Sequence, residues 1–247
     1  MKSISSPPLP GTTCDPLYPD SDGEPMGETE YHMVAAWHLF YALKCWYRQR
    51  KRSDVYVAGT MLLYYEEGNP LAFRGPDVMV CKGVVGNHPR RSFRTWEEGV
   101  VPAVIFEVVS KKTLKEDRVE KPPMYASLGV KELFLFDPEG GYLRPSLQGF
   151  KLVRRRYVPL ATDDRGDLFS TELGMSLKIE GHLLRLTDRD TGERLPTDEE
   201  LAEQASLARQ QAKRAKRDAQ QAKRRAAELE AELARLRASS QRRKNGK

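Results

Sequence analysis

Apolar and polar residues follow regular periods along most of the chain from residue 28 onward. Between Tyr31 and Cys45 the apolar positions recur at helical spacing, which predicts an amphipathic helix packed on a sheet. The helix runs into a basic cluster at residues 48–52, which suits the negative end of a helix dipole. Its packed face is expected to hold Tyr31, Val34, Ala35, His38, Tyr41, Ala42 and Cys45.

Runs of β-branched and aromatic residues predict a series of strands. Residues 102–109 hold one charge among apolar residues, which is typical of a buried central strand. Residues 83–100 show no period and are expected to form an excursion at the sheet edge. The pattern favours an α/β fold, and its other expected strands are residues 55–65, 77–80, 131–136, 150–160 and 183–187.

A second helix is expected to follow the central strand. Thr113 and Glu116 fit a capping box, in which each side chain satisfies a backbone donor near the other residue. On a regular helix Asp117, Lys121 and Tyr125 would share one face. The pair Pro122-Pro123 removes amide donors, however, so we expect a kink or two short helices.

The C-terminal segment is rich in Ala, Gln, Glu, Lys, Arg and Leu and lacks Gly and Pro until Gly246. A capping box at residues 197–200 opens it, which predicts one long helix. Apolar residues at spacings of three and four predict a short coiled coil, and hence a homo-oligomer: Leu201, Ala205, Ala208, Ala212, Leu229, Leu233 and Leu236.

Composition divides the chain into segments. Residues 1–27 are rich in Pro, Ser, Gly and Asp, which predicts a flexible N-terminal arm. A globular domain is expected over residues 28–190, followed by a linker at 191–198. The helical coiled-coil segment is placed at 199–238 and a basic disordered tail at 239–247.

The net charge of +6 lies entirely in the C-terminal segment. Residues 198–247 hold 14 Lys or Arg and 8 Asp or Glu, whereas residues 1–197 hold 27 of each. The core therefore gives no general support to a polyanion-binding surface. Its local basic face comprises Lys111, Lys112, Lys115 and Arg118.

No apolar run is long enough to cross a bilayer, and the N-terminus lacks the apolar segment of a signal peptide, so a cytoplasmic protein without membrane contact is expected. Cys14, Cys45 and Cys81 are widely spaced and are expected to be thiols.

Two acids stand among apolar runs, where charge is costly unless something binds it. Asp77 opens one expected strand and Glu107 lies on its neighbour. Mg²⁺ prefers oxygen ligands and keeps several waters, so one or two carboxylates suffice to hold it. A lysine nearby would position water or stabilise developing charge. These residues point to phosphodiester hydrolysis with Mg²⁺ or Mn²⁺.

Structural explanations compete with this interpretation. Asp77 follows a proline and is typical of a hydrogen-bond acceptor at a strand end. Glu107 would equally form a structural ion pair with Lys121 or Arg118. The four histidines show no ligand spacing, and His38 is expected to be a core residue.

An ordered set of motifs resembles the Uma-type putative restriction endonuclease family within the PD-(D/E)XK nuclease superfamily. The motifs are Pro76-Asp77, Glu107-Val-Val-Ser110, Asp117-x-x-x-Lys121-x-x-x-Tyr125 and the segment from Gly129 to Asp137-Pro138, and the similarity spans roughly residues 28–187. The resemblance implies a restriction-endonuclease-like mixed sheet flanked by helices.

The resemblance also implies a metal held by Asp77, Glu107 and the backbone carbonyl of Val108, with assistance from Glu28 or Glu30. In the superfamily the lysine lies two residues after the strand glutamate, where this chain has Val109. The resemblance assigns that role to Lys121, supported by Ser110, with Asp117 and Tyr125 on the same helix face. Lys111 and Lys112 are its competitors.

The expected function is a Mg²⁺- or Mn²⁺-dependent endonuclease acting on DNA. The alternative is a catalytically silent nuclease-like domain that binds DNA or oligomerises through its coiled-coil tail. The intact acid pair and lysine favour the enzyme.

Overall fold

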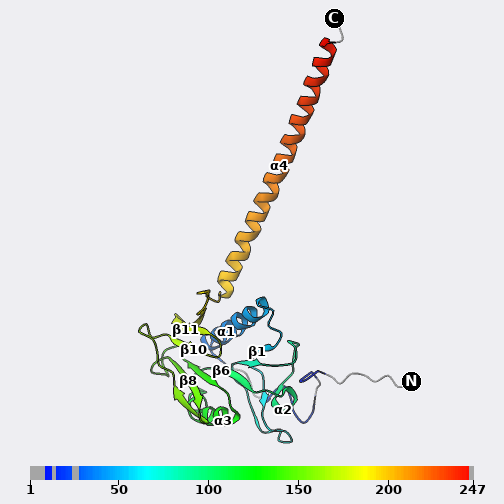
Figure 1. Cartoon of the computed structure of the whole chain (residues 1–247). Helices are drawn as coiled ribbons and strands as arrows, with labels where there is room; N and C mark the ends of the chain where they lie inside the picture. Colours follow the sequence, from blue (N-terminus) through cyan, green and yellow to red (C-terminus); the bar gives the residue numbers. More distant parts are fainter. Residues whose placement is uncertain (1–8, 13–14, 24–27, 245–247) are drawn as a thin grey trace, which may run out of the picture. The chain divides into compact units, whose positions relative to one another are not determined.

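The computed structural model describes residues 9–12, 15–23 and 28–244. The chain forms two compact units, residues 1–195 and residues 196–247 (Figure 1). The first unit contains every strand, and the second contains the helix α4 (Asp198–Lys244). Within the described residues, no helix combines the length and apolar character needed to cross a membrane.

A six-stranded mixed sheet forms the centre of the first unit (Figure 1). Its strand order is β1-β4-β6-β7-β8-β9, in which β6 and β7 are parallel and the other neighbours are antiparallel. All seven residues of β6 are buried, which confirms the predicted central strand. The strands are β1 (Val55–Gly59), β4 (Val78–Lys82), β6 (Pro102–Val108), β7 (Glu132–Phe136), β8 (Leu147–Val153) and β9 (Arg156–Pro159).

Alternate residues of β6 face two different cores. Phe106 packs in a core with the helix α1 (Glu30–Gln49) and a three-stranded sheet. Ile105 packs in the other core with Tyr125 of the helix α3 (Lys121–Leu128). Glu107 alternates with Phe106 and so lies on the α3 side. The smaller sheet comprises β10 (Leu168–Ser170), β11 (Met175–Glu180) and β12 (Leu183–Asp188).

The packed face of α1 differs from the predicted one. Ala35, His38 and Ala42 are buried as expected, but Tyr31, Val34 and Tyr41 are exposed. The sequence carries two apolar stripes at helical spacing, and the sheet covers the one that contains the leucines Leu39 and Leu43. The buried stripe consists of His32, Ala35, Ala36, His38, Leu39, Ala42, Leu43, Trp46 and Tyr47.

The predicted strand at residues 55–65 is broken in two. β1 ends at Gly59, and Thr60 then adopts a positive φ of 47°. A side chain at position 59 would come within 3.2 Å of Phe40, so the small residue lets α1 approach this point. The chain continues into a small sheet of β2 (Leu63–Tyr64), β3 (Phe73–Arg74) and β5 (Phe93–Arg94), and β5 leads into α2 (Thr95–Glu98).

The described part of the N-terminal segment is packed rather than free, contrary to the predicted arm. Tyr18 is 7% exposed and lies in a ring cluster with Tyr64 and Trp96. Its hydroxyl accepts a hydrogen bond from the Gly68 amide at 2.6 Å, and the Tyr64 hydroxyl donates to the Pro19 carbonyl at 2.7 Å. Tyr18 and the ion pairs of Asp15 with Arg94 and of Asp20 with Arg91 hold these described residues against the domain, which the polar composition of the segment did not reveal.

The second unit begins with the predicted capping box. The Glu200 amide donates to the Thr197 hydroxyl, and the Thr197 amide donates to the Glu200 carboxylate. The helix then runs through residues 239–244, where a disordered tail was expected. Leu229 and Leu233 are exposed along it, whereas the side chain of Leu236 lies outside the described part. Cys45 and Cys81 are free thiols, and Cys14 also lies outside the described residues.

Candidate active site

Asp77 lies at the start of β4, held from two sides. Val78 pairs with Phe106 across the antiparallel ladder, so the preceding Asp77 comes alongside the end of β6. One Asp77 oxygen accepts a hydrogen bond from the Val108 amide at 2.7 Å. The other lies 3.3 Å from His32 Nε2, which α1 contributes. Asp77 therefore joins the first helix to the central strand.

Glu107 is fully buried on β6, and each of its oxygens has a partner from α3. Lys121 Nζ donates to Oε2 at 2.9 Å, and the Tyr125 hydroxyl donates to Oε1 at 2.6 Å. Because both partners come from one short helix, the helix fixes the orientation of the carboxylate. Lys121 is itself 5% exposed, so the ion pair lies away from bulk solvent.

Asp117 completes the cluster. Its Oδ1 accepts a second hydrogen bond from Lys121 Nζ at 2.8 Å. Asp117 is 1% exposed, so this pair is buried rather than on the solvated helix face that its i,i+4 spacing suggested. Its other oxygen, Oδ2, is buried without a hydrogen bond of good geometry. A carboxylate oxygen left in this state is costly.

The local chain path explains how Asp117, Lys121 and Tyr125 converge. A π-helical turn, η1 (Glu116–Glu120), precedes α3, with Pro122 and Pro123 at the first positions after it. The two prolines lack the amide donors that a regular α-helix would use, and the wider turn accommodates them. The three side chains still reach one side, and Gly129 ends α3 with a φ of 95°.

The capping pair that starts this segment lies three residues earlier than predicted. Ser110 and Thr113 bond reciprocally, because each backbone amide donates to the other residue's hydroxyl. The expected pair, Thr113 with Glu116, is replaced by this arrangement. Ser110 therefore positions the segment that carries Asp117 and Lys121.

Burial and mutual repulsion dominate the electrostatics of the cluster. Burial raises the pKa of Glu107, Lys121 opposes that rise, and the charges of Asp77 and Asp117 add to it. Burial likewise raises the pKa of Asp117 against the opposing effect of Lys121. Burial alone would lower the pKa of Lys121, but Glu107 and Asp117 outweigh it and raise that pKa. Lys121 thus bonds two of the three acids, Glu107 and Asp117, while the third, Asp77, lies beside His32, whose pKa it raises.

The donor set suits a hard divalent cation. The cluster offers the carboxylate oxygens of closely spaced acids, and one buried oxygen of Asp117 has no hydrogen bond of good geometry. As arranged in the described residues, no three His, Cys, Asp or Glu side chains form a ready metal cage. Mg²⁺ does not need one, because it binds through one or two carboxylates and retains waters. Each Glu107 oxygen accepts one hydrogen bond and keeps a second lone pair for a cation.

Some predicted site residues lie apart from the cluster. Glu30 is exposed in the first turn of α1, and Lys111 and Lys112 are exposed, so Lys121 is the lysine that reaches Glu107. The charge of Glu28 contributes to the raised pKa of His32. Val108 contacts Asp77 through its amide.

His32 is the residue that sequence reasoning missed. It is 6% exposed, and although burial lowers its pKa, the hydrogen bond and charge of Asp77 outweigh this and raise it. The spacing of the four histidines does not single it out. A signal for a fixed position of His32 is its place three residues after Thr29, whose hydroxyl caps α1 by accepting a hydrogen bond from the His32 amide.

An acid pair and a lysine on a helix-flanked mixed sheet are the features that the restriction-endonuclease-like class combines. The chain belongs to the Uma2 family, described as "Putative restriction endonuclease", whose model matches residues 18–187. The match begins at Tyr18, the residue that anchors the N-terminal segment.

Among solved structures, the chain resembles a putative nuclease belonging to DUF820 from Anabaena variabilis. The two chains share 10% sequence identity at a TM-score of 0.41, over 55% of this chain and 69% of the other. No curated protein sequence matches the chain.

Proposed function

We infer that the chain is an endonuclease that hydrolyses DNA phosphodiester bonds with the help of Mg²⁺ or Mn²⁺. The observation that carries this inference is the buried cluster of acids, in which Glu107 and Asp117 share the ammonium of Lys121 and Asp77 bonds the amide of Val108, next to Glu107. Membership of a restriction endonuclease family supports the reaction class.

Asp77 and Glu107 would hold the cation, with the Val108 carbonyl as a further oxygen. When bound, the cation neutralises charge on the transferring phosphoryl group and lowers the pKa of a water molecule. Tyr125 and Lys121 keep the Glu107 carboxylate in one orientation, and His32 and the Val108 amide do the same for Asp77. Lys121 also places a fixed positive charge beside the reacting phosphate, while Asp117 positions Lys121.

Cleavage of supercoiled and single-stranded DNA with Mg²⁺ or Mn²⁺ tests the proposal. Asp77→Ala and Glu107→Gln should each reduce the rate by about 1000-fold, because several kcal/mol of transition-state stabilisation depends on the cation. Lys121→Ala should reduce it by about 100-fold, the lower range for loss of one preorganised electrostatic group.

Glu120→Gln is the matched control. Glu120 is an exposed acid on the same helical segment and pairs with Lys115, so its conversion to an amide should leave the rate unchanged. Equal rates in wild type and both acid variants would overturn the assignment of the site.

The alternative function is a silent nuclease-like module that binds DNA or self-associates through α4. The basic excess of residues 198–247 and the exposed Leu229 and Leu233 support this possibility. It predicts no cleavage by wild type on either substrate. Deleting residues 198–247 should then lower the oligomeric state or weaken DNA retention, as measured by light scattering and gel shift. If neither changes, α4 has neither role.

A further inference from the structure

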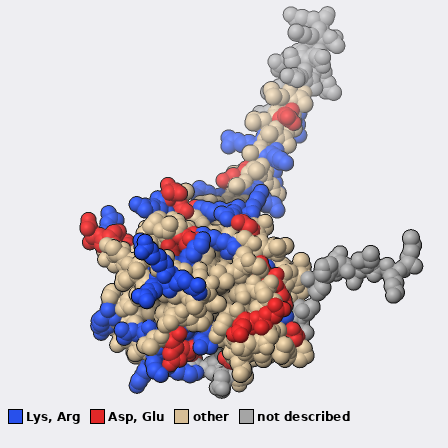
Figure 2. Space-filling model, turned by 60° about the horizontal axis from the view of Figure 1, so that its bottom comes forward, with Lys and Arg blue, Asp and Glu red and all other residues tan. Residues whose placement is uncertain are grey.

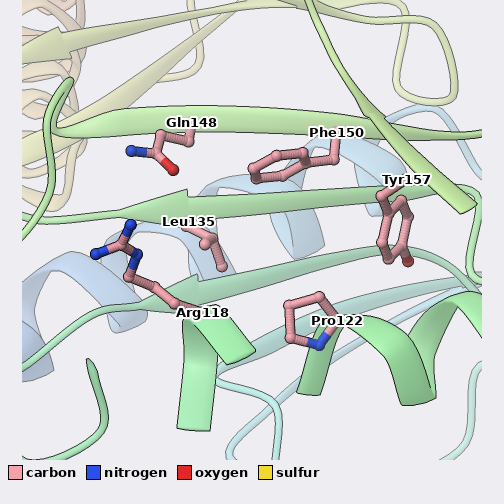
Figure 3. Close-up of a pocket in the computed structure, with 6 residues that line it drawn as sticks. All are labelled: Arg118, Pro122, Leu135, Gln148, Phe150 and Tyr157. Carbon is pink, nitrogen blue, oxygen red and sulfur yellow. The ribbon is translucent and has the colours of Figure 1, made fainter. Parts of the chain in front are cut away.

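A cavity of about 200 Å³ adjoins the acid cluster on the α3 side of the sheet (Figure 3). Leu135 in its wall pairs in register with Glu107, and Arg118 at its edge directly follows Asp117. The cavity therefore lies one strand away from the buried glutamate. Its lining residues come from η1, α3, β7, β8 and β9, and they are Arg118, Pro122, Leu135, Gln148, Phe150 and Tyr157.

The lining combines apolar walls with two polar groups. Phe150 and Tyr157 present rings 6.4 Å apart, and Pro122 lies across from them (Figure 3). The Gln148 amide nitrogen donates to the Arg144 and Pro145 carbonyls, and its carbonyl oxygen points into the cavity (Figure 3). This environment suits a flat aromatic ligand with a hydrogen-bonding edge.

Three arginines surround the opening. A second hollow of about 460 Å³ shares Arg118 and Tyr157 with the cavity and is also lined by Arg155 and Arg156. All three arginines are exposed, and within the described residues none has a carboxylate partner. Lys and Arg side chains also gather in a patch on the face of this domain shown in Figure 2. Unpaired guanidinium groups beside a cavity are suited to bidentate contacts with phosphates.

The turn that presents Arg155 is conformationally unfavourable. β8 and β9 join through Arg154 and Arg155, which have φ angles of 48° and 65°, and Val153 pairs with Arg156 to close the hairpin. A two-residue turn with two positive φ angles favours Asn-Gly, because a Cβ atom is disfavoured there. Of the two arginines, only Arg155 lines a hollow, so its place in this unfavourable turn indicates a requirement other than turn formation.

We propose that this cavity binds one unpaired nucleobase and that Arg118, Arg155 and Arg156 hold the phosphates on either side of it. A cavity of about 150 Å³ admits benzene, so this cavity has room for a single base. A base stacked and paired within a duplex cannot enter unless it is extruded. The inference rests on the proposed function in taking DNA as the ligand, and it specifies single-stranded or locally unpaired DNA as the preferred form.

Equilibrium binding of the full chain to fluorescent oligonucleotides in a chelating buffer tests the proposal without cleavage. The three probes are a 12-nucleotide single strand, the same strand with a central run of abasic sites, and the corresponding duplex. The intact single strand should bind at least about 5-fold more tightly than the abasic strand, the lower limit for stacking one base. The duplex should also bind more weakly than the intact strand.

Charge variants separate the arginine site from general attraction. Arg118→Gln and Arg156→Gln should each weaken single-strand binding by about 5-fold and reduce the salt slope by about 0.7 per lost phosphate contact. Arg154→Gln is the matched control, since it removes the same charge from the same turn without lining either hollow. It should leave binding within about 2-fold of wild type, and thermal unfolding verifies that each variant is folded.

Equal binding of intact and abasic strands would overturn the base site, and equal losses in Arg154→Gln and Arg156→Gln would overturn the phosphate site. Both outcomes leave the proposed function intact if Glu107→Gln still abolishes cleavage. Base-dependent binding without any cleavage by wild type would support the nucleotide site and reject the enzyme.

Discussion

Two buried ionic clusters in the same domain differ in their charge balance. Arg90 and Glu98 form a one-to-one pair with side chains 0% exposed, joined by two hydrogen bonds of 2.6 and 3.0 Å. Arg90 also donates to two backbone carbonyls and lies 4.2 Å from the Tyr56 ring centre. The acid cluster instead places the carboxylates of Glu107 and Asp117 on the one ammonium of Lys121, and Asp117 Oδ2 has no hydrogen bond of good geometry.

The contrast separates an ion pair that is saturated by its own partners from a cluster with more acids than lysines. In the first cluster each guanidinium nitrogen of Arg90 donates a hydrogen bond, and both Glu98 oxygens accept one. In the second cluster two carboxylates share one ammonium group, and burial raises the pKa of both acids. Burial alone therefore does not distinguish the two, and the surplus of buried acids makes the second cluster the candidate site.

The largest expected effect comes from breaking the balanced pair. Arg90→Met should destabilise the protein by about 3 to 5 kcal/mol, because Glu98 would remain buried without its partner. Urea unfolding measures this loss. Cleavage per folded molecule should stay unchanged, and a selective fall in that rate would contradict a purely structural role for the pair.

A smaller change in stability is expected from the addition of Mg²⁺. Mg²⁺ at 100 times its dissociation constant should stabilise the wild type by about 2.7 kcal/mol, since it binds only the folded state. Thermal unfolding with and without Mg²⁺ reports this gain. Glu107→Gln should lose most of it, whereas Glu120→Gln should keep it. An equal gain in both variants would indicate that Mg²⁺ binds elsewhere.

Removing one carboxylate should partly relieve the imbalance. Asp117→Asn deletes a buried charge, while Lys121 keeps its bond to Glu107, so the metal-free protein should become more stable by about 1 to 2 kcal/mol. The Mg²⁺-dependent gain should fall at the same time. If Asp117→Asn instead destabilises the metal-free protein, Asp117 is a structural partner of Lys121.

The smallest expected effect comes from the uncharged residue that supports the cluster. Ser110→Ala removes the hydroxyl that caps the Thr113 amide and should cost about 1 kcal/mol of stability. Ser110→Asn retains a capping oxygen and should recover most of the loss in urea unfolding. A large loss of cleavage in Ser110→Ala with unchanged stability would mean that Ser110 acts directly on the substrate.

The sequence was sufficient for those parts of the fold that local pattern determines. Residues 102–108 form the buried central strand because an apolar run with one charge fits only a strand covered on both faces. The Thr197–Glu200 capping box starts the long helix because its two residues recognise each other locally. The expected family was confirmed, and its model matches ten residues further toward the N-terminus than the expected span, over residues 18–187.

Tertiary packing decided the features that the sequence did not reveal. The face of α1 depends on which of two apolar stripes meets the sheet, and the break at Thr60 depends on the approach of Phe40 to Gly59. The capping partner of Thr113 is Ser110 rather than Glu116, through two reciprocal hydrogen bonds.

The candidate site shows the same division. The motif spacing predicts that Asp77, Glu107 and Lys121 belong to one site. Their contacts, however, depend on the register of β4 against β6 and on the π-helical turn before Pro122. His32 was missed because its partner Asp77 is distant in sequence.

Tyr18 has a practical consequence for the boundaries of the folding unit. A fragment that starts at residue 28, where helical periodicity begins, would lack the ring that fills the space between Tyr64 and Trp96. Loss of a buried aromatic side chain typically costs about 3 to 5 kcal/mol. An independently folding fragment of this protein should therefore begin upstream of Tyr18, and protease trimming between residues 18 and 28 should lower its melting temperature.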